Sequence, residues 1–360
     1  MFIKNSWYIA AFSREIINLN LFSRTICGIP MVFYRQEDSG VPVAFFDACP
    51  HRFFPLSKGT LTSSGIQCGY HGLQFDGKGK CVNIPGQETI PESACVQKFP
   101  LVEKNNIAWV WPGDPALADE DKIPAFEITD RSTCGLDFSC FDVHSPNWLH
   151  SGGEHISVEA NYRLVVDNLL DLSHADFIHR NTIGSSHTDS KIQIETHFDD
   201  STLHHLWSML DTKPPHVYTM ANDIEPDSVD FWLDTHLYLP STFILEHGVT
   251  ASGRPREEGV CLNNINALTP ETETTTHYFW VQSLLKTEGR EVQDKQIVDL
   301  WRKLTKNVFA EDEWALAEQQ RRLSILGIDE LEGQKRITLE ADRPSVIAGK
   351  MLKKLEKLEI

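Results

Sequence analysis

Short apolar runs separated by turn-forming clusters fill the first 115 residues of the chain. These runs are rich in β-branched and aromatic residues, which favours strands; examples are residues 31–34, 43–46 and 107–111. Clusters with Gly and Asp, such as residues 76–79, lie between the runs and predict turns. The pattern therefore predicts an all-β region over residues 1–115.

The rest of the chain predicts a mixed structure. The stretch 112–124 contains Pro, Gly and acidic residues, so residues 116–124 are predicted to be an exposed linker to a second domain at 125–360. Residues 161–179 are expected to be helical after a short strand, and residues 191–285 to be mostly strands. Two further helices are predicted from apolar residues at helical spacing. They cover residues 291–324, with Ile297, Trp301, Leu304, Val308 and Ala315, and residues 345–358, with Ile347, Met351, Leu355 and Leu358.

Composition narrows the function classes. The chain has 360 residues, 41% of them hydrophobic and 23% charged, which fits a two-domain globular enzyme. A net charge of −18 argues against nucleic acid and anionic membrane surfaces as partners. There is no apolar run of the ~20 residues that a membrane span needs. The eight cysteines show no paired framework apart from Cys49 and Cys68, so a reducing cytoplasm is expected.

Two short clusters each supply one cysteine and one histidine. They are Cys49-Pro50-His51-Arg52 and Cys68-Gly69-Tyr70-His71-Gly72. Two thiolates and two imidazoles make a four-ligand metal site, and zinc is one interpretation. A Rieske [2Fe–2S] centre needs two cysteines on one iron and two histidines on the other. Two facing loops that each offer one cysteine and one histidine satisfy that asymmetry, so the spacing favours a Rieske cluster.

A second candidate metal site lies in the second domain. His174 and His179 lie in a stretch dense in ligand types, and non-haem Fe(II) oxygenases use two His and one carboxylate. Five residues along a helix turn the side chain by roughly 140°, so the pair shares a metal only if the helix ends or bulges between them. Otherwise they are ordinary histidines near a helix end. Asp312 faces inward on the predicted helix 291–324 and is the best third ligand, with a core salt bridge as the alternative.

Two neighbouring residues are candidates for supporting roles. Asp171 precedes His174 by three residues and is placed to accept its second ring N–H. Asn168 lies one turn earlier and is expected to line the iron cavity. We therefore treat Asp171 and Asn168 as candidate catalytic positions.

These motifs resemble a known family. C-P-H-R, C-x-Y-H-G and N-L-L-D-L-x-H-A-x-F-x-H resemble the oxygenase (alpha) component of Rieske non-haem iron aromatic ring-hydroxylating systems. The segments N-S-W-Y-I-A-A-F, W-V-W-P-G-D-P-A-L-A-D and L-T-P-E-T-E-T-T-T-H-Y-F-W resemble its vanillate O-demethylase, dicamba O-demethylase and toluenesulfonate methyl-monooxygenase branch.

The resemblance implies an α+β chain with an N-terminal Rieske domain and a helix-grip (START/Bet v1-like) catalytic domain with a curved antiparallel sheet. It implies a [2Fe–2S] cluster on Cys49, His51, Cys68 and His71, and mononuclear Fe(II) on His174, His179 and Asp312. It also implies a head-to-tail homotrimer in which electrons pass from the Rieske centre of one subunit to the iron of the next. In such a trimer His71 lies near Asp171, which bridges to His174.

The activity implied is oxidation of an aromatic substrate, specifically an aromatic acid, in aromatic hydrocarbon catabolism. O₂ and electrons from a separate NAD(P)H-dependent flavin and iron–sulfur reductase would drive hydroxylation or O-demethylation. No G-x-G-x-x-G follows a strand, so the chain itself is not expected to bind NADH by a Rossmann fold. The alternatives are a cis-dihydroxylating dioxygenase and, in another class, a zinc-stabilised helix-grip ligand-binding protein.

The chain departs from related patterns at a few positions. High-potential Rieske proteins carry a disulfide between the cluster loops and a Ser that bonds a cluster sulfide; the corresponding positions here are Phe54, Tyr70 and Leu73. Fewer hydrogen bonds to sulfur predict a low reduction potential. Asn266 stands where dicamba-type enzymes place a His that grips a carboxylate. Residues 130–158, with Cys134, Cys140, His144 and His155, look longer than the branch usually has.

Overall fold

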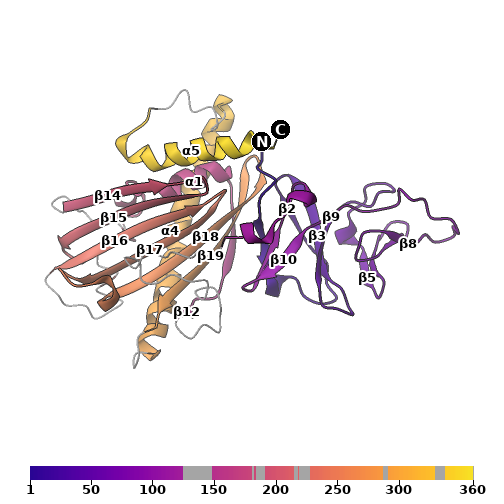
Figure 1. Ribbon diagram of the computed structural model, residues 1–360, viewed down its shortest axis with the longest axis horizontal. Helices are drawn as coiled ribbons and strands as arrows, with labels where there is room; N and C mark the ends of the chain where they lie inside the picture. The colour runs from indigo at the N-terminus through magenta and orange to yellow at the C-terminus, as the bar shows by residue number, and fades with distance from the viewer. Residues whose placement is uncertain are drawn as a thin grey trace. The chain divides into compact units, whose positions relative to one another are not determined.

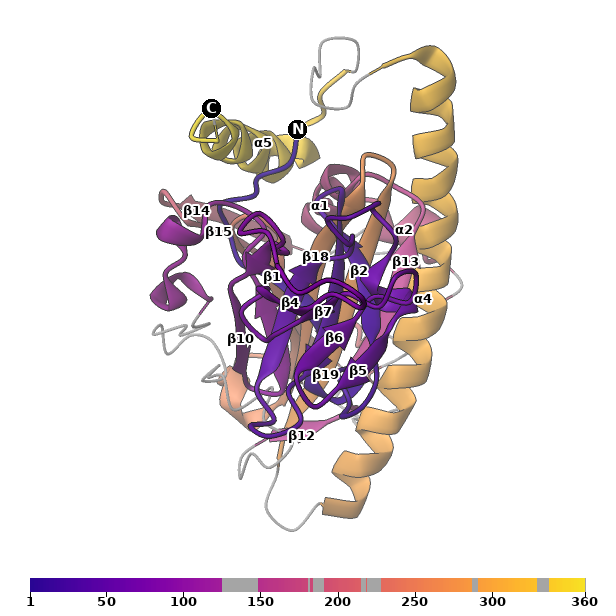
Figure 2. The same cartoon turned by 90° about the vertical axis from the view of Figure 1, so that its right-hand side faces the viewer.

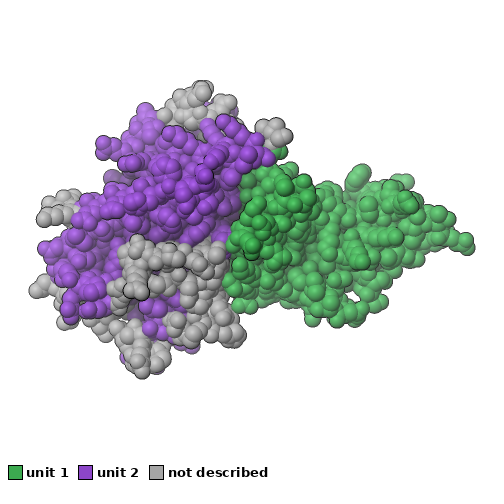
Figure 3. Space-filling view, in the orientation of Figure 1, with its two compact units in different colours: residues 1–123, 269–273, 359 green, residues 124–268, 274–358, 360 purple. Residues whose placement is uncertain are grey.

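The computed structural model of the protein describes residues 1–124, 148–180, 182–183, 191–214, 218, 228–286, 291–328 and 337–359. Cys134, Cys140 and His144 lie outside the described residues. The chain forms two compact units, coloured separately in Figure 3. Unit 1 comprises residues 1–123, 269–273 and 359, and unit 2 comprises residues 124–268, 274–358 and 360.

Unit 1 is built from three small sheets. One has the order β1 (Tyr8–Phe12), β11 (Ile107–Val110), β10 (Leu101–Lys104). The second has the order β2 (Phe22–Ile26), β3 (Ile29–Arg35), β4 (Pro42–Phe46), β9 (Lys98–Phe99). The third has the order β5 (Thr60–Thr62), β6 (Gly65–Gln67), β7 (Gln74–Phe75), β8 (Cys81–Asn83). Its described helices are single 3₁₀ turns at Ser13–Glu15, Leu56–Lys58, Pro115–Leu117 and Glu120–Lys122.

The strands of unit 1 present the two Cys-His clusters on neighbouring loops. The first cluster follows β4 and the second follows β6. Phe45, Ile66 and Phe75 are fully buried in the apolar core that also encloses Cys49 and Cys68. Strand burial therefore anchors the cysteine end of each loop.

Unit 2 is dominated by one large antiparallel sheet (Figure 1). The strand order is β12 (Trp148–His150), β19 (Thr275–Leu285), β18 (Val260–Thr272), β17 (Thr242–Ala251), β16 (Val229–Tyr238), β15 (Thr202–Thr212), β14 (Lys191–Phe198). β13 (Glu154–Val158) also pairs with β19. Most neighbours in the sheet are consecutive in sequence, so the sheet is largely a meander of long hairpins.

Helices pack along this sheet. α4 (Glu291–Leu326) is the long helix of Figure 2. Its buried positions recur at helical spacing and include Ile297, Trp301, Thr305, Val308, Phe309 and Leu316. α5 (Arg343–Glu356) lies beside α1 (Tyr162–Leu170) in Figure 1 and buries Pro344, Ser345, Ala348 and Leu352. The predicted stripe of α5 is therefore shifted, and Leu358 is 73% exposed.

The prediction of one helix over residues 161–179 is wrong. α1 ends at Leu170, and a separate one-turn helix, α2 (Ala175–Ile178), follows. The break occurs because the Asp171 carboxylate accepts hydrogen bonds from the backbone N–H and the hydroxyl of Ser173, at 2.8 and 2.6 Å. Such local side-chain bonds compete with helix continuation. They place His174 directly before α2 and His179 directly after it.

The predicted fold class is confirmed. An all-β unit comes first, and a large antiparallel sheet with a long amphipathic helix follows. The predicted strand region 191–285 and the helix over 291–324 are both present. Within the described chain, none of the helices combines the length and the apolar character needed to cross a bilayer.

Candidate metal centres

The two Cys-His loops of unit 1 fold in the same way. The backbone N–H of Cys49 donates to the carbonyl of Phe54 at 2.9 Å, and that of Cys68 donates to the carbonyl of Leu73 at 2.8 Å. Both bonds span five residues. Each loop is therefore closed at the base by the backbone of its own cysteine, which holds the thiol in place.

The same position in each loop adopts a left-handed backbone. Phe53 has φ +57° and donates its N–H to the Cys49 carbonyl at 2.8 Å, and Gly72 has φ +74° and donates to the Cys68 carbonyl at 3.1 Å. A Cβ at Gly72 would lie 2.9 Å from the Pro85 side chain, which accounts for glycine there. The loops are matched in conformation although their sequences differ.

The four candidate ligands divide into a buried pair and an exposed pair. Cys49 and Cys68 are 1% and 2% exposed. His51 and His71 are exposed, and their ring centroids are 4.5 Å apart. Burial is the main cause that raises the pKa of the Cys49 thiol, to about 11. Two buried thiols on one side and two paired imidazoles on the other fit the two unlike irons of a Rieske cluster.

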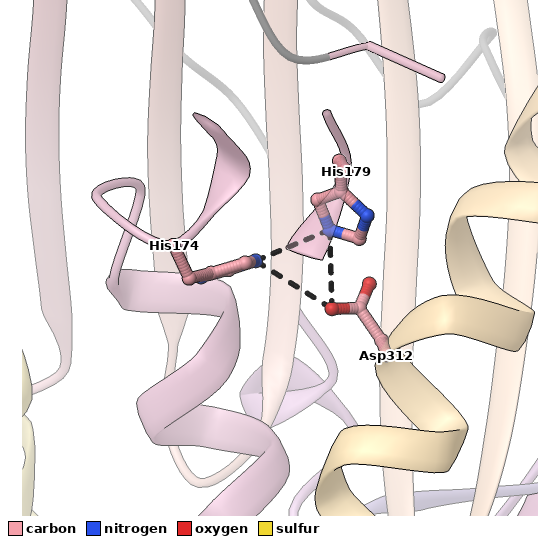
Figure 4. Close-up of side chains that lie close together, drawn as sticks. All are labelled: His174, His179 and Asp312. Carbon is pink, nitrogen blue, oxygen red and sulfur yellow. Dashed lines mark hydrogen bonds and ion pairs between the residues drawn. The ribbon is translucent and has the colours of Figure 1, made fainter. Parts of the chain in front are cut away.

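The second candidate centre lies in unit 2 (Figure 4). His174 and His179 approach from the two ends of α2, and Asp312 projects from α4. Nε2 of His174 lies 3.2 Å from Nε2 of His179 and 3.5 Å from Oδ1 of Asp312. Nε2 of His179 lies 3.2 Å from the same Oδ1. Three ligands at about 2.0–2.2 Å from one metal ion would be separated by about 3 Å. The spacing therefore fits a single ion held on one face.

Asp312 is largely enclosed and is held by several donors. Its side chain is 14% exposed, and Nδ2 of Asn168 donates to its Oδ1 at 3.0 Å. Burial by itself would raise the pKa of Asp312, but hydrogen bonds from the two histidines and Asn168 outweigh it and lower that pKa to about 2. The group is a carboxylate at neutral pH, as a metal ligand must be.

Sequence reasoning missed the role of Glu311. Its Oε2 lies 2.9 Å from Nδ1 of His179, and the Thr182 hydroxyl donates to the same oxygen at 2.8 Å. Burial opposes protonation of His179, but the carboxylates of Asp312 and Glu311 outweigh it and raise the pKa of that ring. A carboxylate on the second ring nitrogen fixes the tautomer that leaves Nε2 free for a metal. Only its position next to Asp312 could have pointed to Glu311.

Asp171 precedes His174 by three residues, and its side chain bonds locally. Its carboxylate is occupied by Ser173, as described above. The predicted bridge from Asp171 to His174 therefore stays a prediction. The structure brings Asn168, His174, His179 and Asp312 together within unit 2.

A cavity of 1320 Å³ lies inside unit 2. Its wall is one face of strands β14 to β18 together with α2, α4 and the segment that enters α5. Ala175 and Asp176, next to His174, line it, and so do Val308 and Phe309, one turn before Asp312. The cavity therefore reaches the elements that carry the candidate metal ligands. The strands contribute four polar side chains to the cavity wall: Thr196, His205, His247 and Asn264. Burial lowers the pKa of both histidines, so all four side chains are uncharged at neutral pH.

The other large ring side chains of unit 2 differ in whether they line the cavity. Trp207 lines the cavity. Trp232, His236 and Trp280 are buried, whereas Phe177 is 77% exposed. Asn266 is also buried, and its amide donates to the backbone carbonyl of Asn264 at 3.3 Å.

Comparison with protein families settles the relationship of the chain. Residues 6–100 match the Rieske [2Fe-2S] domain, and residues 158–358 match the vanillate O-demethylase oxygenase C-terminal domain. The chain belongs to the vanillate O-demethylase family of Rieske oxygenases. The predicted family, enzyme class and fold are thus confirmed.

Relatives match nearly the full length of this Rieske oxygenase. The dicamba O-demethylase oxygenase component of Stenotrophomonas maltophilia is 34% identical over 363 residues, covering 99% of each chain. The vanillate O-demethylase oxygenase subunit of Pseudomonas sp. (strain HR199 / DSM 7063) is 32% identical, covering 90% of this chain and 87% of its own. The crystal structure of dicamba monooxygenase bound to dicamba superposes with a TM-score of 0.84 at 33% identity, covering 99% and 98% of the two chains.

Membership in this family establishes the chemistry class. The chain is the oxygenase component of a Rieske oxygenase system, with a [2Fe–2S] cluster and a mononuclear non-haem iron as cofactors. As one component of such a system it depends on a separate reductase. The predicted cofactors are confirmed.

Proposed function

We propose that this Rieske oxygenase O-demethylates or hydroxylates an aromatic substrate with O₂ and electrons from an NAD(P)H-dependent flavin and iron–sulfur reductase. The observation that carries the proposal is the set of two histidines and one carboxylate beside a large apolar cavity. The dicamba and vanillate O-demethylases among its relatives support demethylation as the reaction.

The roles of the ligands follow from their geometry. We assign the cluster to Cys49, His51, Cys68 and His71, and the mononuclear iron to His174, His179 and Asp312. When bound, the cluster supplies single electrons and the ferrous ion activates dioxygen. We take residues 1–115 as the electron-transfer domain, 116–124 as the linker and 125–360 as the catalytic domain.

The surrounding residues orient these ligands. Asn168 holds Oδ1 of Asp312, and Glu311 holds Nδ1 of His179, so both ligands are fixed before metal or substrate arrives. Apolar side chains of α4 and the sheet line much of the cavity beside these ligands. Asp171 is proposed as the bridge from the His71 of a neighbouring subunit to His174 in a homotrimer.

For a methoxy-aromatic substrate the overall reaction consumes one O₂, two electrons and two protons. One oxygen atom is inserted into a methyl C–H bond and the other leaves as water. The resulting hemiacetal breaks its O–CH₂ bond, releasing formaldehyde and the phenol. Cis-dihydroxylation is kept as the alternative outcome only by analogy of fold, because one fold can host several reactions.

The test is a panel of methoxy-aromatic compounds with the iron-loaded protein and a surrogate reductase. We expect formaldehyde and phenol in equal amounts, whereas cis-diols without formaldehyde would favour the dioxygenase alternative. Metal analysis tests the alternative that the chain is a zinc-stabilised binding protein. About three irons per chain and the EPR signal of a Cys₂His₂ cluster are expected, and zinc in a colourless protein would refute the oxygenase proposal.

A further inference from the structure

One end of the cavity lies far from the metal ligands. Trp301 precedes Asp312 by eleven residues on α4, which corresponds to about 16 Å along the helix axis. Its ring centroid lies 5.0 Å from that of Tyr218 and 5.0 Å from that of His247. Asn264 lies beside them, because β17 and β18 pair His247 with Leu262 and Leu245 with Asn264. We call these four cavity-lining residues the neutral end: Tyr218, His247, Asn264 and Trp301.

The neutral end is uncharged at physiological pH. Burial lowers the pKa of His247 to about 4 and raises that of Tyr218 well above its usual value. The Tyr218 hydroxyl and Nδ1 of His247 are 2.5 Å apart, so one hydrogen bond joins the two side chains. When the hydroxyl donates, the proton of the neutral imidazole is on Nε2, which makes this ring a donor for a ligand.

The neutral end also contains one unmet donor and one unmet acceptor. Among the described residues, Nε1 of Trp301 and Oδ1 of Asn264 are buried without a hydrogen-bond partner, and each residue is 5% exposed. Leaving such groups unpaired in the interior is unfavourable, so most are satisfied in a functioning protein. Two orphans of opposite kind beside one cavity point to a ligand that both accepts and donates.

The cations that line the cavity lie at the other end. In the part of the chain that the structure describes, they are Arg343 and Lys350, both exposed on α5. The hydroxyl of Ser345 on the same helix donates to the backbone carbonyl of Asp167, next to Asn168. Because Asn168 holds Asp312, these cations lie toward the metal ligands and cannot neutralise an anion at the neutral end.

We propose that the neutral end holds an uncharged group that both donates and accepts hydrogen bonds, such as a carboxamide, at the far end of an elongated aromatic substrate. This inference rests on the proposed function, because it assigns the substrate class of the same site. The volume of 1320 Å³ exceeds the roughly 300–1,000 Å³ of common ligand sites, which leaves room for more than one ring. A carboxylate would offer acceptors only and would bring an unpaired charge into the interior.

The experiment compares two ligands of the same shape. 4′-Methoxybiphenyl-4-carboxamide and 4′-methoxybiphenyl-4-carboxylate are titrated calorimetrically into the iron-loaded protein. Two variants remove the neutral end: His247→Phe and the nearly isosteric Asn264→Leu. His236→Phe is the matched control, because His236 is also a buried histidine that is paired at 2.7 Å, with His204, but does not line the cavity.

We expect the wild type and the control to bind the carboxamide at least tenfold more tightly than the carboxylate. That ratio should fall below threefold in His247→Phe and Asn264→Leu. Equal or tighter binding of the carboxylate, binding of neither ligand, or a ratio that survives in both variants would overturn the inference. Asn264→Leu keeps the Tyr218–His247 pair, so the test stands if His247→Phe does not fold.

The same preparation separates this inference from the proposed function. Iron content and reductase-driven O₂ consumption are measured alongside the titrations. An iron-loaded enzyme that consumes O₂ and binds the carboxylate more tightly would refute the inference about the neutral end but not the proposed function. A protein without iron or O₂ consumption would refute the proposed function itself, whichever ligand it binds.

Discussion

Glu311 should control the iron affinity of the centre without touching the iron. Its carboxylate lies 2.9 Å from Nδ1 of His179, whose side chain is 2% exposed, while its own is 28% exposed. Glu311→Ala would leave the buried ring N–H of His179 unpaired and the ring free to turn. The Thr182 hydroxyl would lose the same acceptor.

Two independent magnitudes agree on the size of the effect. An unsatisfied buried donor costs about 1–3 kcal/mol. Loss of a carboxylate partner behind a metal-bound histidine typically reduces metal affinity or activity by about 10–100-fold, which is about 1.4–2.8 kcal/mol. We therefore expect Glu311→Ala to weaken Fe(II) binding by about 10–100-fold, and Glu311→Gln, which keeps an acceptor, to weaken it by less than about tenfold.

The assay is anaerobic Fe(II) titration against a competing chelator. The Rieske EPR signal serves as an internal measure of folding, because its ligands belong to the other unit. Glu313→Ala is the matched control, two residues farther along α4 and half-buried, with Glu159 as its charged neighbour rather than a histidine. Iron affinity of Glu311→Ala within twofold of the wild type would refute the reasoning.

Three further outcomes are expected. Asp312→Ala should abolish substrate turnover and retention of the mononuclear iron but leave the Rieske EPR signal intact; surviving turnover would show that Asp312 is not a ligand. Leu73→Ser should raise the reduction potential of the Rieske cluster in an EPR-monitored redox titration, because the hydroxyl adds a hydrogen-bond donor near the cluster. Truncating this buried leucine should also lower the free energy of unfolding by about 2 kcal/mol or more. An unchanged or lower potential would contradict the prediction. Burial lowers the pKa of His236 to about 3, so between about pH 3 and 6.5 the unfolded chain binds the extra proton and stability falls as the pH falls. His236→Phe should reduce the change of the free energy of unfolding with pH by up to about 1.4 kcal/mol per pH unit. Urea unfolding at pH 7 and 5.5 measures this change, and an unaltered pH dependence would disprove the prediction.

Local pattern was enough for much of the fold. Strand runs such as residues 107–111 alternate with turn residues, and α4 carries its apolar residues at helical spacing, so neighbouring residues encode each element. The break after Leu170 was not predicted, because the apolar pattern of residues 161–179 continues through it. It depends on the Asp171 carboxylate bonding to Ser173, and residue order does not show which of several competing bonds forms.

The sequence alone was enough to predict the donor chemistry of both candidate centres, since ligand type and loop spacing are local. A Cys-His pair on each of two loops suits few metal groups. The sequence also singled out Asp312, because an acid on the apolar stripe of a helix needs a partner. Only the tertiary structure decided that Glu311 stands behind His179 and that the neutral end lines the cavity. These contacts join residues more than a hundred positions apart or on different elements of the fold. Packing of α4 against the sheet brings them together, and no short-range pattern records that packing.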